Sequence, residues 1–245
     1  GETGPGRMAE PAAILAAVEG RLSPGPLRGR RALVTSGPTV EAIDPVRFIS
    51  NRSSGKQGHA IAQALADLGA DVTLISGPVA VPDPTGVRVV RVESALAMLN
   101  AARAALPVEV AVCAAAVADW TVVNRSTEKR KKKVGAPPPV IELAPNPDIL
   151  ATLSQPGPLR PRLMVGFAAE TESLIDNARD KRARKGCDWI LANDVSEDSG
   201  TFGGDSNCVH LVDAHGVDSW PRLPKTEIAR RLAQRVAAAL AEEDS

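Results

Sequence analysis

Residues 48–58, FISNRSSGKQG, place many hydrogen-bond donors and few bulky side chains where a strand should pass into a helix. Gly55 and Gly58 have the Gly-x-x-Gly spacing that lets backbone amides approach a phosphate at a helix N-terminus. Neither the glycine spacing of a Walker loop nor the full dinucleotide fingerprint is present. From its own spacing, the stretch fits a tight turn as well as a phosphate site. Arg47 and Asn51 favour an anion site, because an arginine beside an amide suits a carboxylate or an acyl phosphate.

Two further motifs follow predicted strands. In AAAVADW, residues 114–120, small side chains would let a ligand lie against the backbone, although close packing of a helix on the sheet explains the alanines equally well. Asp119 in this motif is placed to accept from a base, bind a ribose or hold Mg²⁺. NPDI, residues 146–149, follows a predicted strand at 140–144. Asp148 is a candidate helix N-cap, and Asn146 is held extended by the proline that follows it.

Cationic residues form the third group of candidates. The run EKRKKK, residues 128–133, contains five consecutive cations, which are most simply a solvated loop. Neighbouring glycine and proline suggest a flap instead, and cations on a flap can close over phosphates. Lys181 and Lys185 stand on one face of a predicted helix. The helix dipole explains Lys185 in the last turn, but explains Lys181 poorly.

Other kinds of chemistry find little support in the sequence. His59, His210 and His215 lack the spacing of metal ligands, and no Ser-His-Asp or Cys-His arrangement can be recognised in the sequence. The candidate residues instead fit positioning and charge neutralisation, as in phosphoryl and nucleotidyl transfer.

These residues need a scaffold that brings them together, and the apolar pattern supplies one. Strands are predicted at 31–39, 71–78, 87–92, 108–120, 162–171 and 189–194, with helices at about 56–69, 94–106 and 173–186 between them. A hairpin at 208–223 and a helix from about Thr226, its predicted N-cap, to residue 242 complete the chain. The predicted fold is therefore α/β, a Rossmann-like, mostly parallel sheet with helices on both faces and a C-terminal β-hairpin extension. In such a fold the candidate motifs share one edge, beyond the carboxyl ends of the strands.

Composition limits the class of protein. The 245 residues are 44% hydrophobic, carry no net charge, and include 2% aromatic residues and no tyrosine. Nucleic acid is therefore not an expected partner. Three widely spaced cysteines suggest a reducing compartment, and no segment is long and apolar enough for a membrane span, so we expect a cytoplasmic protein that does not bind membranes. Residues 1–29 are predicted to be a tail and linker from a preceding domain, and residues 30–245 the main domain.

Six motifs occur together in one order: SGPTVEAIDPVRFISNRSSGKQG, AAAVADW, EKRKKK, NPDI, GFAAET and KRARKGCDWILANDV. Jointly they resemble the bacterial phosphopantothenate–cysteine ligases. These enzymes activate 4′-phosphopantothenate with CTP as an acyl-cytidylate, then join it to L-cysteine. The segment GPGRMAEP resembles the end of a phosphopantothenoylcysteine decarboxylase domain, to which the ligase is commonly fused and to which FMN would belong.

The resemblance implies roles for individual residues. Asn51 would hold the acyl-cytidylate, and Lys129 would neutralise charge during activation, with Mg²⁺ or Mn²⁺ as the metal and no metal ligand assigned. The implied CTP site consists of Asp119, Lys129, Asn146, Pro147, Asp148, Ile149, Phe167, Lys181 and Lys185. The implied phosphopantothenate site consists of Arg47, Asn51, Ser53, Ser54, Gly55, Ala115 and Ala116. A homodimer is also implied, in which the flap closes over a neighbour's site and the 208–223 hairpin is a candidate contact.

Two other classes of function remain open from the sequence. The parallel sheet and the Gly-x-x-Gly turn are also compatible with a nucleotide- or dinucleotide-binding protein that performs no ligation. A purely structural partner of a decarboxylase is the third hypothesis.

Overall fold

The computed structural model describes residue 11 and residues 25–131, 135, 138–170, 172–194 and 204–244. Most of the predicted tail and linker, residues 1–29, lies outside these residues, and so do Lys132 and Lys133 of the cationic run. Leu27 is buried in the body and its amide donates to the carbonyl of Leu68 at 2.9 Å. The division between a tail and a main domain stays a prediction.

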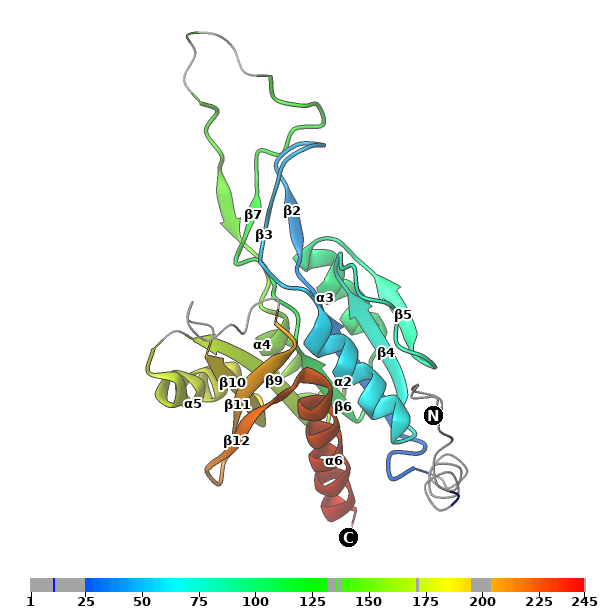
Figure 1. Ribbon diagram of the computed structural model, residues 1–245. Coiled ribbons are helices and arrows are strands. Elements are labelled where there is room, and N and C mark those ends of the chain that lie inside the picture. The colour runs from blue at the N-terminus through cyan, green and yellow to red at the C-terminus, as the bar shows by residue number, and fades with distance from the viewer. Residues whose placement is uncertain are drawn as a thin grey trace, which may run out of the picture.

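A central sheet of eight strands forms the body of the molecule (Figure 1), in the order β12-β11-β10-β9-β6-β1-β4-β5. The parallel strands are β1 (Arg31–Ser36), β4 (Asp71–Ser76), β5 (Arg88–Arg91), β6 (Val110–Cys113), β9 (Leu163–Glu170) and β10 (Trp189–Asp194). The hairpin of β11 (Ser206–Val212) and β12 (Val217–Pro224) extends the sheet in antiparallel fashion. The predicted sheet and C-terminal hairpin are thus confirmed.

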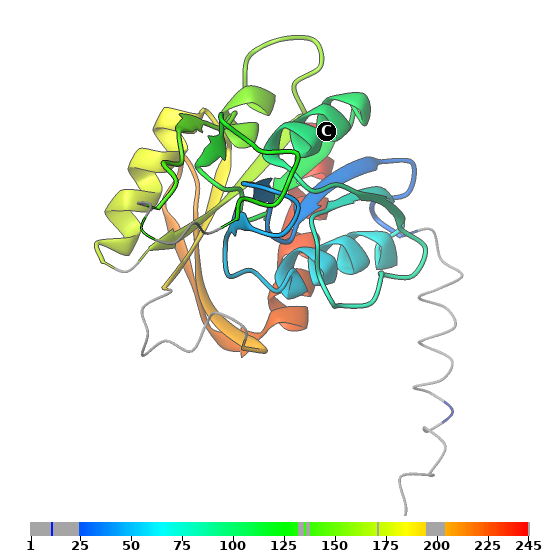
Figure 2. The same cartoon turned by 90° about the horizontal axis from the view of Figure 1, so that it is seen from above.

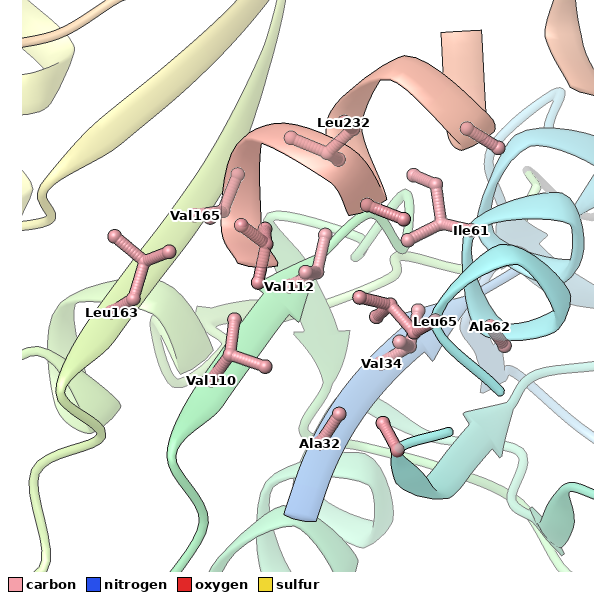
Figure 3. Close-up of a cluster of buried hydrophobic side chains, with 14 of the residues drawn as sticks. Ala32, Val34, Ile61, Ala62, Leu65, Val110, Val112, Leu163, Val165 and Leu232 are labelled. Atoms are coloured by element: carbon pink, nitrogen blue, oxygen red, sulfur yellow. The ribbon is translucent and has the colours of Figure 1, made fainter. Parts of the chain in front are cut away.

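Helices cover both faces of this sheet (Figure 2). One face carries α2 (Lys56–Asp67) and α6 (Lys225–Glu243), and the other carries α3 (Ala95–Ala104), α4 (Ile149–Leu153) and α5 (Leu174–Lys185). Alternation along β1 explains the two cores, because Val34 joins Ile61 and Leu232 on one face (Figure 3), whereas Leu33 joins Met98 on the other. None of the helices in the described part of the chain is long and apolar enough to cross a membrane.

The start of α6 differs from the prediction. The helix begins at Lys225, its N-cap position is Pro224, and no side chain caps it, so the predicted Thr226 cap is wrong. The Lys225 amide donates to the carbonyl of Asp205 at 2.8 Å. Pro224 has no backbone N–H and a fixed φ. These properties and the hydrogen bond from Lys225 set the start of the helix without a side-chain cap.

Two small antiparallel pairs project from the body as an arm (Figure 1). We use "the arm" for residues 40–50 together with the described residues of 120–145. It contains β2 (Val40–Ala42) paired with β3 (Phe48–Ser50), and β7 (Trp120–Val122) paired with β8 (Leu143–Pro145). Buried Glu41 ties the arm to the body, because its carboxylate accepts from the amide of Ala95 at 2.9 Å and from the hydroxyl of Thr121 at 3.0 Å. The predicted strand at 108–120 is therefore wrong in extent: β6 ends at Cys113, and Trp120 belongs to the arm.

Candidate functional site

Two adjoining pockets lie at the carboxyl edge of the parallel strands. We call them the helix-start pocket, about 290 Å³ and lined by residues 53–58 at the beginning of α2, and the Asp148 pocket, about 240 Å³. They share Ala115, Val117, Phe167 and Lys181. Two ligands bound in these pockets would therefore meet at a common wall.

Tight packing shapes the helix-start pocket. Gly55, in the left-handed region with φ 74°, precedes α2 as its N-cap residue. The Ser36 hydroxyl at the end of β1 donates to the Gly55 carbonyl at 3.0 Å and lies 2.9 Å from Nδ1 of His59. A Cβ on Gly58 would lie only 2.4 Å from the Ser36 oxygen. Local packing thus requires both glycines whatever the ligand, and it places residues 53–58 at the start of α2 along the pocket wall, where a helix N-terminus favours an anion.

Three lysines give this pocket a positive character: Lys56, Lys181 and Lys225 all line it. Burial lowers the pKa of Lys181 and of Lys225, with a further contribution from the neighbouring cations Lys185 and Lys56, respectively. Lys56 forms an ion pair with Asp205 at 2.6 Å. Cations crowded at a helix start provide a binding environment for a phosphate or carboxylate.

The sequence analysis missed part of this lining. Asn193, Asn207 and Lys225 come from β10, β11 and the start of α6, and each is almost fully buried. The signal for Asn193 was available, because it lies one residue before the carboxyl end of the parallel strand β10. Asn207 and Lys225 reach the same edge only because the antiparallel hairpin returns to it.

The Asp148 pocket is built by two loops that hydrogen-bond to each other. The amide of Asn146 donates to the carbonyl of Asp119 at 2.8 Å, and its side-chain Nδ2 donates to the carbonyl of Ala118 at 2.9 Å. The predicted cap by Asp148 is confirmed, since its carboxylate accepts from the amide of Ala151 at 2.9 Å. Asp148 also pairs with Lys185. Although burial raises the pKa of Asp148, the hydrogen bonds from Lys185 and Ala151 outweigh burial and lower it.

The predicted CTP residues converge on this second pocket. Its lining includes Asp119, Asn146, Pro147, Asp148, Ile149, Phe167, Lys181 and Lys185. Lys129 is the exception, because it lies on the arm with an exposed side chain and lines neither pocket.

The predicted phosphopantothenate residues divide between the other pocket and the arm. The helix-start pocket is lined by Ser53, Ser54, Gly55, Ala115 and Ala116. Asn51 is exposed beside this wall, where its Nδ2 donates to the carbonyl of Ala116 at 3.1 Å. Arg47 lies on the arm, where its guanidinium binds Asp44 and the carbonyl of Arg130.

Thiols and metal-ligand clusters contribute little to the site. Cys113 lines the Asp148 pocket, but burial, reinforced by Cys187 and Asp148, raises its pKa to about 12. It is therefore a neutral thiol near pH 7 and a poor nucleophile. Within the described residues, no group of three or more His, Cys, Asp and Glu side chains is arranged to hold a metal ion.

Comparisons with known proteins agree with the motif pattern. The family described as "DNA/pantothenate metabolism flavoprotein C-terminal domain" matches residues 27–240. The coenzyme A biosynthesis bifunctional protein CoaBC of Vibrio cholerae is 44% identical over 230 residues, which cover 94% of this chain and 57% of that protein. CoaBC of Escherichia coli K12 is 44% identical over 214 residues, covering 86% of this chain and 52% of that protein. The chain thus spans about half the length of the curated relatives it matches.

Solved structures show the same fold. The crystal structure of the C-terminal domain of CoaBC matches with a TM-score of 0.74 and 38% identity, over 89% of this chain and 99% of that one. A DNA/pantothenate metabolism flavoprotein from Streptococcus pneumoniae matches with a TM-score of 0.73 at 24% identity, over 86% of this chain and all of that one. The resemblance inferred from six motifs is confirmed at the level of the family.

Proposed function

Because the chain belongs to the family of DNA/pantothenate metabolism flavoprotein C-terminal domains, we propose that it is the phosphopantothenate–cysteine ligase part of a bifunctional coenzyme A biosynthesis protein. The missing part would be a fused, FMN-dependent decarboxylase domain. One observation carries the proposal: residues assigned to two different substrates line two separate pockets that share a wall.

The proposed reaction has two steps. A carboxylate oxygen of 4′-phosphopantothenate attacks the α-phosphorus of CTP, and pyrophosphate leaves. The amine of L-cysteine then attacks the acyl carbon, the bond to CMP breaks, and the amine loses a proton as the amide forms. The shared wall at Ala115 and Phe167 is where a nucleotide in the Asp148 pocket and an acid in the helix-start pocket would react. Holding both there converts a bimolecular step into an effectively intramolecular one.

Charge neutralisation would come from several groups around this wall. Lys181 lines both pockets, and Lys129 would approach from the arm during activation. Asp119 fits a Mg²⁺ ion that arrives with the nucleotide, because Mg²⁺ usually takes one or two carboxylates together with substrate phosphates and water. Such an ion would offset the negative charge of the phosphates.

We further propose a homodimer that uses the arm. Phe48 is 58% exposed, Trp120 53% and Val140 76%, so the arm carries a group of large apolar side chains open to solvent. Exposed apolar patches of this kind mark interaction surfaces. In the β11–β12 hairpin, by contrast, Leu211 and Trp220 are buried against the body. The arm is therefore a better candidate for the dimer contact than the 208–223 hairpin.

Pyrophosphate release tests the function. The purified chain, mixed with CTP, 4′-phosphopantothenate and Mg²⁺, should release pyrophosphate, and addition of L-cysteine should yield 4′-phosphopantothenoylcysteine and CMP. No release with any nucleotide would contradict the proposal. Binding of CTP or NADPH without release would favour a nucleotide-binding protein that performs no ligation.

The role of Asn51 can be tested separately. Asn51→Asp places a carboxylate beside the acyl-cytidylate, whose phosphate is already negative. We therefore expect the intermediate to form but to react slowly with cysteine. Mass spectrometry should show the acyl-cytidylate accumulating. Equal loss of both half-reactions would contradict a role after activation.

A further inference from the structure

Asp44, in the turn of the arm between β2 and β3, is a buried carboxylate outside both pockets. It is 2% exposed. Its Oδ1 accepts from the amides of Val46 and Arg47, each at 2.9 Å. Its Oδ2 accepts from Nε of Arg47 at 3.0 Å, from Nη2 of Arg47, and from the amide of Arg130 at 3.1 Å. The carboxylate therefore joins two segments that are more than eighty residues apart in the sequence.

The second segment is the one that carries Lys129. Both backbone groups of Arg130 are held by the same pair, since its amide donates to Asp44 and its carbonyl accepts from Nη2 of Arg47 at 2.8 Å. The amide of Ser126 adds a hydrogen bond to the carbonyl of Ile43 at 3.0 Å. The peptide that links Lys129 to Arg130 is thus fixed to the 43–47 turn, whereas the Lys129 side chain is exposed.

The electrostatics of Asp44 keep this connection intact near neutral pH. The hydrogen bond from the Arg47 side chain outweighs desolvation and, with the amides of Val46, Arg130 and Arg47, holds the pKa of Asp44 well below its usual range. The carboxylate is therefore ionised, and the guanidinium of Arg47 is committed to it. A charged pair of this kind fixes geometry, because Nε and Nη2 of Arg47 both donate to Oδ2 while the two backbone amides occupy Oδ1.

We propose that Asp44 is a positioning residue for Lys129: through Arg47 and the backbone of Arg130, it holds the lysine-bearing segment in the conformation that activation of the substrate requires. This inference rests on the proposed ligase function. It also assigns Arg47 a structural role, the link between Asp44 and Arg130, in place of contact with the substrate carboxylate.

A double-mutant cycle with Lys129 tests the proposal. Asp44→Asn keeps the shape of the side chain but replaces an acceptor with an amide that faces the Arg47 guanidinium. In the full chain, we expect Asp44→Asn to lower the rate of CTP-dependent pyrophosphate release by at least about tenfold. In a Lys129→Gln background, the same change should lower the remaining rate by less than about twofold, because its effect passes through Lys129.

The controls separate this inference from general damage and from the function itself. Asp83→Asn removes an exposed ion pair with Arg91 and should leave the rate within about twofold of wild type. If Asp44→Asn does not fold, Asp44→Glu takes its place in the cycle, because it keeps the charge but displaces the carboxylate. Additive losses in the cycle, or full activity of the Asp44 variant, would overturn the inference. A wild-type chain that releases no pyrophosphate would instead overturn the proposed function.

Discussion

The carboxyl edge of the sheet and the arm hold their candidate residues by different means. At the edge, close backbone packing fixes the positions: a Cβ on Gly77 would lie 1.7 Å from the carbonyl oxygen of Pro38. On the arm, a buried carboxylate and an arginine join two loops, while Phe48 and Val140 stay exposed. The edge is thus held by packing within one chain, whereas the arm leaves large apolar side chains exposed to solvent. Changes at the packed glycines of the edge should alter stability, and changes on the arm should alter activity or association.

The largest expected effect lies at the edge. Gly77→Ala should lower the free energy of unfolding by more than about 3 kcal/mol, because its Cβ would collide with backbone that cannot move aside. Chemical denaturation measures the loss. Gly157→Ala is the matched control, since nothing lies within 4 Å of its added Cβ, and it should change stability by less than about 0.5 kcal/mol. Equal losses in both variants would show that the edge is not tightly packed.

Lys129→Gln should have the next largest effect, and on activity alone. We expect the first half-reaction to slow by about 100- to 1,000-fold, as for the loss of one preorganised group that stabilises transition-state charge. The thermal midpoint should stay unchanged, because the side chain is exposed. Pyrophosphate release and thermal unfolding measure the two effects.

Lys131→Gln is the neighbouring control for this prediction, since Lys131 is an exposed cation of the same run. It should keep most of the activity. An equal or greater loss of activity in Lys131→Gln would mean that Lys131, two residues further along the run, is the lysine that acts in activation. If Lys129→Gln also lowered the thermal midpoint, the arm would no longer differ from the edge in affecting activity without stability.

The carboxyl edge and the arm also differ in how well the sequence predicted them. Strand-to-helix alternation predicted the sheet, and the rule that ligands bind beyond parallel strand ends predicted that the candidate motifs share one edge, whereas the division of their residues between two sites came from the family resemblance. Asp119 was placed by this rule, whereas Phe167 was placed by the family resemblance. The arm was predicted only in part, as a flap at the cationic run and a strand at 140–144, because its four strands have three residues each, too short for a period of two to be recognised. The contact of Asp44 with Arg130 joins distant loops, and no local pattern encodes such a contact.

A third prediction concerns association through the arm. Phe48→Ser should weaken the proposed dimer by roughly 2 kcal/mol, about 30-fold in the dissociation constant, since one buried aromatic side chain contributes that much. Sedimentation velocity over a range of concentrations measures the shift. Leu159→Ser, at a position that is also exposed but outside the arm, should leave association unchanged. A dimer that tolerates Phe48→Ser, or a wild-type chain that stays monomeric, would contradict the use of this surface.

The smallest expected effect compares two helix caps, one inside the Asp148 pocket and one outside both pockets. Asp148 accepts from the amide of Ala151, and Ser94 accepts from the amide of Ala97. Removing either cap by an alanine substitution should lower stability by about 1 kcal/mol at pH 7. Only Asp148→Ala should also raise the KM for CTP, because Ser94 lines neither pocket.

The pH dependence separates these two caps further. Because the folded-state pKa of Asp148 is lowered, its contribution is present above the unfolded carboxyl pKa, about 3.9, and is lost as the pH falls through the lower folded value. The cost of Asp148→Ala, measured by denaturation, should therefore shrink as the solution is acidified below about pH 4. The cost of Ser94→Ala should not change in that range, because a hydroxyl does not titrate there. A constant cost at Asp148 would mean that its charge does not contribute to the cap, and that the pocket uses this residue only for its shape.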